Sequence, residues 1–332
     1  MKRINRRVVA ARRIALAVGL ASLALPGASV ATCGSAFCAV NTNWDVQGVW
    51  VEPGARVDVR FEYIDQDQPR AGSKKVAVGQ IPEHHDEIQT INRNWFASFD
   101  YVFNANWGVT VTLPVVDRSH DHIHNHHGEQ ILESWNFTAI GDMRVLGRYQ
   151  FMPATTGPAD SPRLNVGGLL FGVKLPTGPF NETNAEGVPA ERSLQPGTGT
   201  TDLLLGGYFR QSLPIRDFTW FAQVLADLPL NTRDEFKPGN QLAATLGLRY
   251  EATATLGLML QLNALFKGRD SGAEAEPRNS GGQFYFLSPG VSYALTKNIQ
   301  AYAFYQVPIY QYVNGVQLTA NWSAVAGLTA RF

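Results

Sequence analysis

The histidines are the residues of this chain whose type and spacing could do chemistry. All 7 lie in two short segments, which comprise His84 and His85 and then His120, His122, His124, His126 and His127. Acidic residues flank both segments, and imidazole and carboxylate groups suit borderline divalent metals such as copper, zinc and nickel. Because His-rich short tracts are a recognised metal-binding composition, we predict that these histidines bind a divalent transition metal.

The spacing of the second segment leaves the geometry of such a site open. In an extended chain, alternate histidines would lie on one side, about 6–7 Å apart by the strand rise. A tetrahedral site would then need the segment to curl or to recruit His84 and His85. The competing interpretation is a solvated polar loop whose histidines bind nothing specific. We expect no enzyme activity, because a nucleophile needs its base within hydrogen-bond reach and no predicted strand carries a histidine near a serine.

The first residues predict a secretory signal peptide over 1–31. Six basic residues precede a short apolar block, and small residues lead to the expected cleavage after Ala31. The block is shorter than the roughly 20 residues that a membrane-spanning helix needs. Removal of the six basic residues from 28 Lys and Arg leaves 22 against 28 Asp and Glu. The mature chain is therefore acidic, and nucleic acid is not an expected partner.

Two cysteines, Cys33 and Cys38, follow the expected cleavage site. They fall in a segment, 32–55, that we expect in the periplasm, where a small disulfide loop is the simplest interpretation. A metal or haem role for the two thiols stays open as the alternative.

The elements that must position these residues are strands, because apolar and polar residues alternate in block after block. From Val316 to Phe332 every second residue is apolar, and the residues between are mostly polar or small. A strand places successive side chains on opposite faces, and this run is long for a strand of a soluble sheet. It predicts a tilted strand that crosses an outer membrane between lipid and a polar lumen. A final Phe332 resembles the C-terminal signal of bacterial outer-membrane barrels.

Counting similar segments, with 135–151 as one strand, gives about 12 strands, an even number as in single-chain bacterial barrels. The sequence predicts an all-β fold: a transmembrane antiparallel up-and-down barrel over 56–332, with both termini periplasmic. Short connections, expected as periplasmic turns, fall at 104–106, 213–217, 252–255 and 295–298, and the connection 152–162 is an exception because it is long for such a turn. Long connections, expected as extracellular loops, fall at 66–89, 118–133, 176–200, 228–240, 267–282 and 308–314.

This topology places every histidine in two adjacent extracellular loops. A soluble β-sandwich or a lipocalin-like barrel would also alternate. The signal peptide, the strand count, the loop asymmetry and the final aromatic residue favour the bacterial outer membrane, with its lipid as a partner.

The polar face of the predicted strands carries both signs of charge. The expected lumen charges are Asp58, Arg60, Glu62, Asp100, Asp142, Arg144, Arg148, Asp202, Arg210, Arg249, Glu251 and Arg331. Opposed charges could form a field across a narrow pore and select polar or anionic solutes. Alternatively, the charges pair with one another and simply occupy the lumen.

Three local phrases resemble a known family. They are Gly141-Asp142 leading to Arg148-Tyr149, the run from Gly172 to Gly178, and the run from Pro196 to Tyr208. Together they look like the outer-membrane transporter-like proteins of the "MetA pathway of phenol degradation" type, over roughly 135–332. The resemblance implies an outer-membrane barrel and passage of small organic molecules, and it brings no catalytic residues. The same phrases also have the composition of strand ends and turns.

The sequence therefore predicts a porin-like outer-membrane channel or transporter for small solutes, with a link to divalent metal through the His-rich segments. One alternative is a surface barrel that binds or senses metal. Another is a barrel that encloses an electron-transfer partner, suggested by Cys33 and Cys38. No cofactor is expected beyond a copper, zinc or nickel ion.

Overall fold

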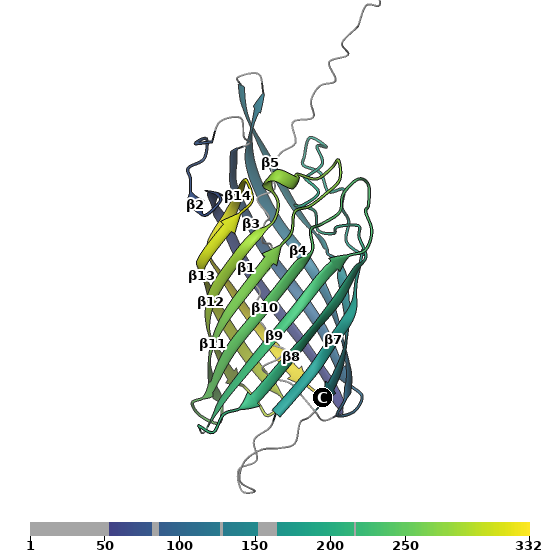
Figure 1. Cartoon of the computed structure of the whole chain (residues 1–332), viewed down its shortest axis with the longest axis vertical. Coiled ribbons are helices and arrows are strands. Elements are labelled where there is room, and N and C mark those ends of the chain that lie inside the picture. Colours follow the sequence, from purple (N-terminus) through teal and green to yellow (C-terminus); the bar gives the residue numbers. More distant parts are fainter. Residues whose placement is uncertain (1–52, 82–85, 127–128, 152–164, 216) are drawn as a thin grey trace, which may run out of the picture. The chain divides into compact units, whose positions relative to one another are not determined.

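The structure is a computed structural model that describes residues 53–81, 86–126, 129–151, 165–215 and 217–332. It is a closed antiparallel barrel of 12 strands (Figure 1). The signal peptide, Cys33, Cys38, His84, His85, His127 and the side chain of His126 lie outside the described residues. Among the described residues, no helix is long and apolar enough to cross a membrane.

The elements follow one another in a simple meander. They are β1 (Gly54–Ala71), β2 (Lys74–Lys75), β3 (Asp86–Val102), β4 (Trp107–His126), β5 (Glu129–Ile140), β6 (Met143–Phe151), β7 (Asn165–Leu175), β8 (Asp202–Ser212), β9 (Phe218–Pro229), β10 (Gln241–Glu251), β11 (Leu256–Lys267), the 3₁₀ turn η1 (Pro277–Asn279), β12 (Gly282–Ala294), β13 (Ile299–Val313) and β14 (Val316–Arg331). Consecutive barrel strands pair, and β14 closes the barrel against β1. Closure removes the exposed edges that an open sheet would leave unpaired in lipid.

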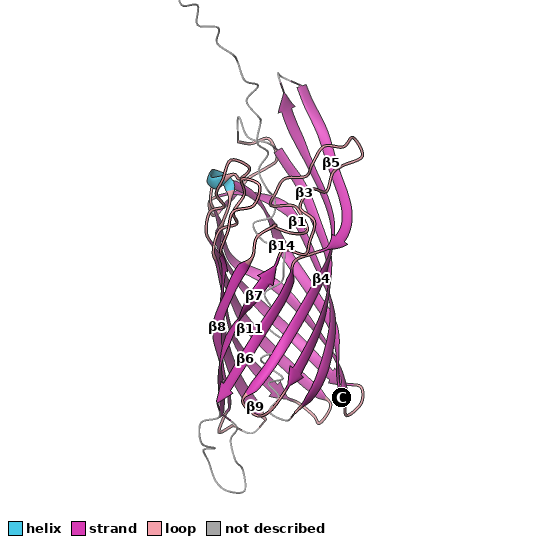
Figure 2. Cartoon of the chain, turned by 90° about the vertical axis from the view of Figure 1, so that its right-hand side faces the viewer, coloured by secondary structure: helices cyan, strands magenta, loops and turns pink. Residues whose placement is uncertain are grey.

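The predicted strand over 135–151 is interrupted at Gly141-Asp142. Its first part, β5, pairs with the upper part of β4, whereas β6 pairs with the lower part of β4 and with β7. The two elements together occupy one strand position in the barrel. The β4–β5 hairpin continues past the neighbouring strands at one end of the barrel (Figure 2).

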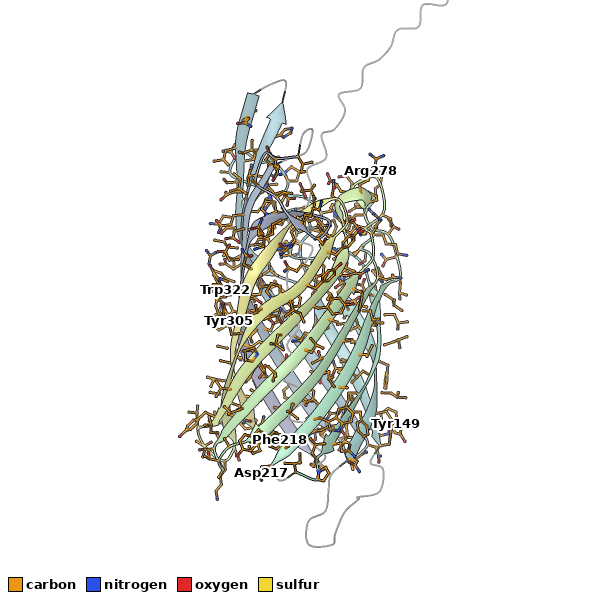
Figure 3. The ribbon with its side chains drawn as sticks, turned by 60° about the vertical axis from the view of Figure 1, so that its left-hand side comes forward. Tyr149, Asp217, Phe218, Arg278, Tyr305 and Trp322 are labelled. Carbon is orange, nitrogen blue, oxygen red and sulfur yellow. The ribbon has the colours of Figure 1, made fainter. Side chains whose placement is uncertain are left out.

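The outer face of the barrel carries an exposed apolar belt. Its residues include Val59, Leu113, Leu169, Leu205, Leu246, Leu260 and Leu328. Aromatic pairs lie at two levels of the barrel. The ring centroids of Tyr305 and Trp322 are 5.6 Å apart, and those of Phe218 and Tyr250, near the end where β9 begins, are 4.6 Å apart (Figure 3). An apolar belt between aromatic girdles is the surface that a membrane-embedded barrel presents to lipid.

The two ends of the barrel differ in their connections. One end, which we call the short-turn end, has the short connections 103–106, 213–217, 252–255 and 295–298, as predicted, while the exceptional connection 152–162 lies outside the described residues. The other end, which we call the long-loop end, has the loops 176–201, 230–240 and 268–281. These three loops also agree with the prediction.

Three other predicted long loops are wrong in part, because strand continues into them. β1 extends to Ala71, β13 to Val313, and β4 to His126, where β5 begins three residues later. Backbone pairing persists there without apolar alternation, since the ladder needs only N–H and C=O groups. The histidines of the second segment that the structure describes therefore lie on a strand rather than in a loop.

The terminal strand β14 also departs from strict alternation. Leu318 is 0% exposed although it belongs to the apolar series that we predicted to face lipid. The β1–β14 register shifts at Gln66, and the β13–β14 ladder ends at Gln306 and Ser323. Past that point the Gln311 side chain donates to the Ala320 carbonyl at 3.0 Å. A bulge thus changes which side chains face inward near the long-loop end.

Candidate functional site: inner wall and long-loop end

The predicted lumen charges lie on the inner wall or at its rim, and most of them are paired. Arg56 bonds Asp100 at 3.0 Å, with both side chains less than 5% exposed. Arg148 lies 3.8 Å from the same carboxylate. The Tyr302 hydroxyl lies 3.0 Å from each carboxylate oxygen of Asp58. Pairing of this kind offsets the cost of removing charges from water.

Further pairs lie higher on the wall and at the short-turn rim. Arg60 bonds Glu62 at 3.0 Å, and Arg249 bonds Glu251 at 2.5 Å. Arg144 bonds Asp227 at 2.9 Å, yet its side chain remains 44% exposed. Arg210 pairs in register with the buried Phe221, and Arg331 with Arg56, so both follow the inner rows. The wall therefore combines buried ion pairs with a few charged groups that remain open to water.

Neutral side chains complete the wall between these charges. Thr245, Asn263, Ser288 and Gln306 form a hydrogen-bonded row across four strands, at 3.0, 2.8 and 3.2 Å in turn. Apolar clusters lie beside this row, one around Phe304 and Met259 and another around Phe221 and Leu170. Because neighbouring members of the row hydrogen-bond one another, most of the cost of burying them is offset.

The three phrases of the family resemblance meet at one place near the long-loop end. Lys174 lies 2.6 Å from Asp202 and 3.4 Å from Asp142, and its ammonium donates to the Thr198 hydroxyl at 2.6 Å. The Thr200 hydroxyl donates to Asp202 at 2.7 Å. We call these five residues the lysine cluster.

The lysine cluster fixes the two ends of loop 176–201. Asp142 accepts from the backbone N–H of Gly178 at 3.1 Å and of Thr198 at 2.9 Å. A Cβ at Gly197 would meet the Gly178 carbonyl oxygen at 2.3 Å, so only glycine allows the two loop ends to approach this closely. The turn-like composition of the phrases is therefore real, and the phrases build one buried anchor rather than separate turns.

Loop 176–201 also packs against β5. Ala190 and Leu194 contact Trp135 and Phe137 in one buried cluster. The Trp135 indole donates to the Val188 carbonyl at 3.0 Å, and the guanidinium of Arg118 donates to the Leu194 carbonyl. The loop is thereby held against the inner side of the β4–β5 hairpin.

The other long loops join loop 176–201 at the same end. Arg192 lies over the rings of Phe180 and Phe236, at 4.3 and 5.2 Å, and donates to the Arg233 carbonyl at 3.2 Å. Lys237 and Ser271 exchange backbone hydrogen bonds at 2.8 and 2.9 Å. The three loops 176–201, 230–240 and 268–281 thus form one connected structure at the long-loop end.

Two carboxyls lie within this connected loop structure. Burial raises the pKa of Glu276 to about 8, although the hydrogen bond with Asn279 opposes the rise. Burial also raises the pKa of Glu191, and the charge of Glu276 adds to the effect. Both groups therefore favour the protonated form.

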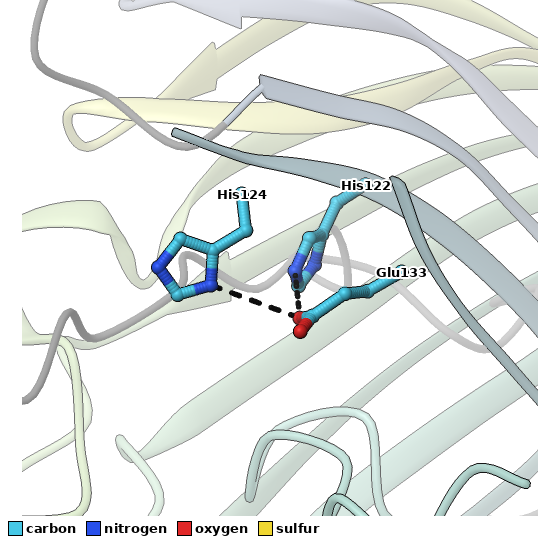
Figure 4. Close-up of side chains that lie close together, drawn as sticks. All are labelled: His122, His124 and Glu133. Atoms are coloured by element: carbon cyan, nitrogen blue, oxygen red, sulfur yellow. Dashed lines mark hydrogen bonds and ion pairs between the residues drawn. The ribbon is translucent and has the colours of Figure 1, made fainter. Parts of the chain in front are cut away.

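The described histidines form a second polar cluster, on the inner side of the β4–β5 hairpin (Figure 4). His122 Nε2 lies 3.1 Å from Glu133 Oε2, and His124 Nδ1 lies 3.8 Å from the same oxygen. One ligand atom from each of the three residues lies within 4.8 Å of the others. We call His122, His124 and Glu133 the histidine cluster.

His120 continues the same row into the wall. Its Nε2 lies 3.3 Å from His122 Nδ1, and its Nδ1 lies 2.8 Å from the Thr90 hydroxyl. Burial lowers the pKa of His120 to about 3, helped by the charges of His122 and Arg118. Trp135 covers the pair, with ring centroids 5.9 Å from His120 and 4.8 Å from His122. His120 is therefore neutral and acts as a hydrogen-bond partner.

Sequence reasoning missed Glu133, Thr90 and Lys174 as site residues. Glu133 lies directly opposite His122 in the β4–β5 ladder, as His126 lies opposite Glu129. A hairpin centred on His127-Gly128 would have given this register, because the residue numbers of every facing pair then add up to the same total. Treating the segment as a loop concealed the signal.

No protein-family model and no curated protein matches the chain. Among solved structures, it is similar to the COG4313 outer membrane channel from Pseudomonas putida F1, with a TM-score of 0.65 at 12% identity, over 88% of this chain and 99% of that one. It is less similar to the NanC porin, at a TM-score of 0.42 and 12% identity over 83% and 100% of the two chains. The CymD monoaromatic hydrocarbon channel gives 0.36 and 11% over 92% and 98%.

Closure of the barrel, its apolar outer belt and the first of these likenesses define the class of the protein. It is a bacterial outer-membrane β-barrel with the fold of an outer-membrane channel. The fold and location predicted from the sequence and from the family resemblance are confirmed at this level.

Proposed function

We propose that the barrel is an outer-membrane channel for small solutes, with the long-loop end facing outward and both termini in the periplasm. The observation that carries the proposal is Arg144, which lies on the inner wall, bonds Asp227 and still exposes 44% of its side chain. A charged group in that position needs water. The inner wall is therefore wet at this height, whereas the outer wall is apolar.

The charges on the wall suggest which solutes pass. Both signs are present, and most carboxylates already have a cationic or hydroxyl partner. Arg144, whose partner Asp227 is far more buried than itself, presents a cationic group to the lumen. We infer a preference for polar or anionic small solutes, because a lumen-facing cation attracts anions at close range.

Single-channel recording in a planar bilayer tests the proposal. The purified chain is expected to give discrete conductance steps with a modest preference for chloride over potassium. Arg144→Glu is expected to reduce or reverse that preference without closing the channel. Lys74→Glu, which makes the same charge change at an exposed position on β2, is the matched control. A silent barrel would contradict the channel, and an unchanged selectivity in the Arg144 variant would contradict the role of Arg144.

The orientation is tested separately in whole cells. Loops of outer-membrane barrels are longer on the extracellular side. A cysteine placed at the exposed Ala185 should react with an impermeant maleimide in intact cells, and one at Thr253 should not. The opposite result would reverse the proposed orientation.

A further inference from the structure

We propose that His122, His124 and Glu133 hold a divalent transition-metal ion at the mouth of the barrel, on the inner side of the β4–β5 hairpin. The ion would be zinc, copper or nickel, because two imidazoles and one carboxylate suit these borderline metals. Metal binding is additional to conduction and does not depend on it.

The ligand atoms are already gathered by rigid elements. His122 and His124 are alternate residues of β4, and Glu133 faces His122 across the ladder. Their ligand atoms lie within 4.8 Å of one another. Donors around one tetrahedral ion lie roughly 3.4 Å apart at normal bond lengths. Small side-chain rotations, with no change of backbone, would complete the approach.

Access and burial are also suited to a metal ion. The His122 side chain is 1% exposed, whereas His124 and Glu133 are 20% and 24% exposed. One ligand is therefore fixed in the wall while two border the open side of the hairpin. Three protein ligands with one accessible side resemble an open metal site, in which water or a solute supplies the fourth donor.

The row behind the cluster orients the inner ligand. If His122 Nε2 binds the ion, its proton sits on Nδ1 and is donated to His120 Nε2, at 3.3 Å. His120 Nδ1–H then donates to the Thr90 hydroxyl, at 2.8 Å. Without the ion, the same three groups can donate in the reverse direction and end in a His122 Nε2–H bond to Glu133, at 3.1 Å. Because the Thr90 hydroxyl can donate or accept, the row accommodates both states with neutral imidazoles.

The alternative explanation is that the His122–Glu133 contact is only a structural hydrogen bond. That explanation accounts for His122 but not for His124 Nδ1, which points to the same carboxylate oxygen at 3.8 Å. Convergence of three ligand atoms on one point is what a metal ion requires.

The test is calorimetric titration of the purified, chelator-stripped full chain with Zn²⁺, with heat-modifiable gel mobility as the measure of folding. The first variant combines His122→Ala, His124→Ala and Glu133→Gln. The second replaces His84, His85, His126 and His127 with Ala and keeps the cluster. Asp121→Asn, a neighbouring carboxylate on β4, is the matched single control for Glu133→Gln.

The wild-type chain, the second variant and the Asp121 variant are each expected to bind one tight Zn²⁺, and the first variant should lose it. Binding retained by the first variant, or lost by the second, would overturn the proposal. If the first variant fails to fold, carbethoxylation of the wild-type chain followed by mass spectrometry still tests whether Zn²⁺ binds at the histidine cluster. Zn²⁺ should protect His124, and equal modification with and without Zn²⁺ would overturn the proposal.

Discussion

Two polar clusters lie near the same end of the barrel, and they differ in chemistry. In the lysine cluster, a cation meets two carboxylates and two hydroxyls, and the Asp142 carboxylate also accepts from two backbone N–H groups. In the histidine cluster, two imidazole nitrogens and a carboxylate oxygen converge, and each of these atoms can donate an electron pair. The first cluster contains its own counter-charge, whereas the second gathers ligand atoms around one point.

This difference separates a structural network from a binding site. Donors and acceptors that satisfy one another rigidify the chain and anchor a loop. Acceptors that face one another gain most when an external cation joins them. The atoms that meet in each cluster therefore decide its role.

Removal of the lysine from its cluster should have the largest effect. Lys174→Met leaves the carboxylates of Asp142 and Asp202 buried without a cation, and breaking a buried ion pair in this way costs about 3–5 kcal/mol. We expect a matching fall in the free energy of unfolding, measured by urea titration of the barrel in liposomes. Lys74→Met, at an exposed position of β2, should change it by less than about 0.5 kcal/mol. Equal effects in the two variants would show that the lysine cluster is not an anchor.

Addition of metal should stabilise the histidine cluster and leave the lysine cluster unaffected. A ligand that binds only the folded chain contributes about 2.7 kcal/mol when its concentration is 100 times the dissociation constant. We expect Zn²⁺ to raise the free energy of unfolding by about this amount in the wild-type chain. The same increment should appear in Lys174→Met, since the two clusters share no residue. Its absence in wild type would argue that the three ligand atoms do not bind together.

Loss of the orienting hydroxyl should weaken the metal site by a smaller amount. Thr90→Val keeps the shape of the side chain and removes the group at the end of the His120 row. Partners of this kind typically change metal affinity by about 10–100-fold. We expect that loss in calorimetry, with full recovery in Thr90→Ser. Wild-type affinity in the valine variant would mean that His122 needs no orientation from this row.

Acidic pH should destabilise the row formed by Thr90, His120 and His122, because His120 becomes protonated. The pKa of His120 is about 3 in the folded chain and 6.5 for an ordinary histidine, so the unfolded chain binds a proton first as the pH falls. The stability that neutral His120 contributes is therefore complete above pH 6.5 and falls as the pH decreases from there toward 3. Hydrogen exchange of the β4–β5 amides should become faster over that range, and His120→Gln should reduce the effect.

A rise in pH should destabilise the connected loops, because Glu276 becomes ionised. The pKa of Glu276 is about 8 in the folded chain and 4.5 for an ordinary glutamate, so ionisation of this carboxyl is unfavourable in the fold. The loop structure loses stability progressively as the pH rises from 4.5 through 8, where Glu276 ionises. Exchange of amides in loop 268–281 should show this dependence, and Glu276→Gln should remove most of it. If Glu276→Gln leaves the pH dependence of amide exchange unchanged, a group other than Glu276 causes it.

The fold was predictable because lipid imposes a strict pattern on the strands. Along Leu242–Tyr250 of β10, apolar residues alternate with smaller or polar ones, and the outer row is exposed as predicted. The pattern loses its meaning where strands leave the lipid. Gln66 lies at a register shift, Leu318 lies just beyond it, and His120–His126 continue a strand with no apolar alternation, so the sequence predicts a loop there.

The kinds of residue in the site were predictable from the sequence, but the contacts between them were not. The histidine segment indicates metal chemistry by itself, while Glu133 becomes a ligand only through the hairpin register. Lys174, Asp142 and Asp202 lie in three separate phrases, and the pairing of the consecutive strands β6, β7 and β8 brings them together. Distant pairing of this kind leaves no local signal in a single sequence. The predicted roles of Cys33, Cys38, His84, His85 and His127 fall outside the described residues and stay predictions.

Anomalous diffraction at the zinc edge, from crystals of the full chain soaked in Zn²⁺, tests the contrast between the clusters most directly. We expect an anomalous peak about 2.0–2.2 Å from His122 Nε2, His124 Nδ1 and a Glu133 carboxylate oxygen. We expect no peak at Lys174, where the ammonium already occupies the cation position. Zinc bound elsewhere, with no density between these three residues, would show that the histidine cluster is not a metal site.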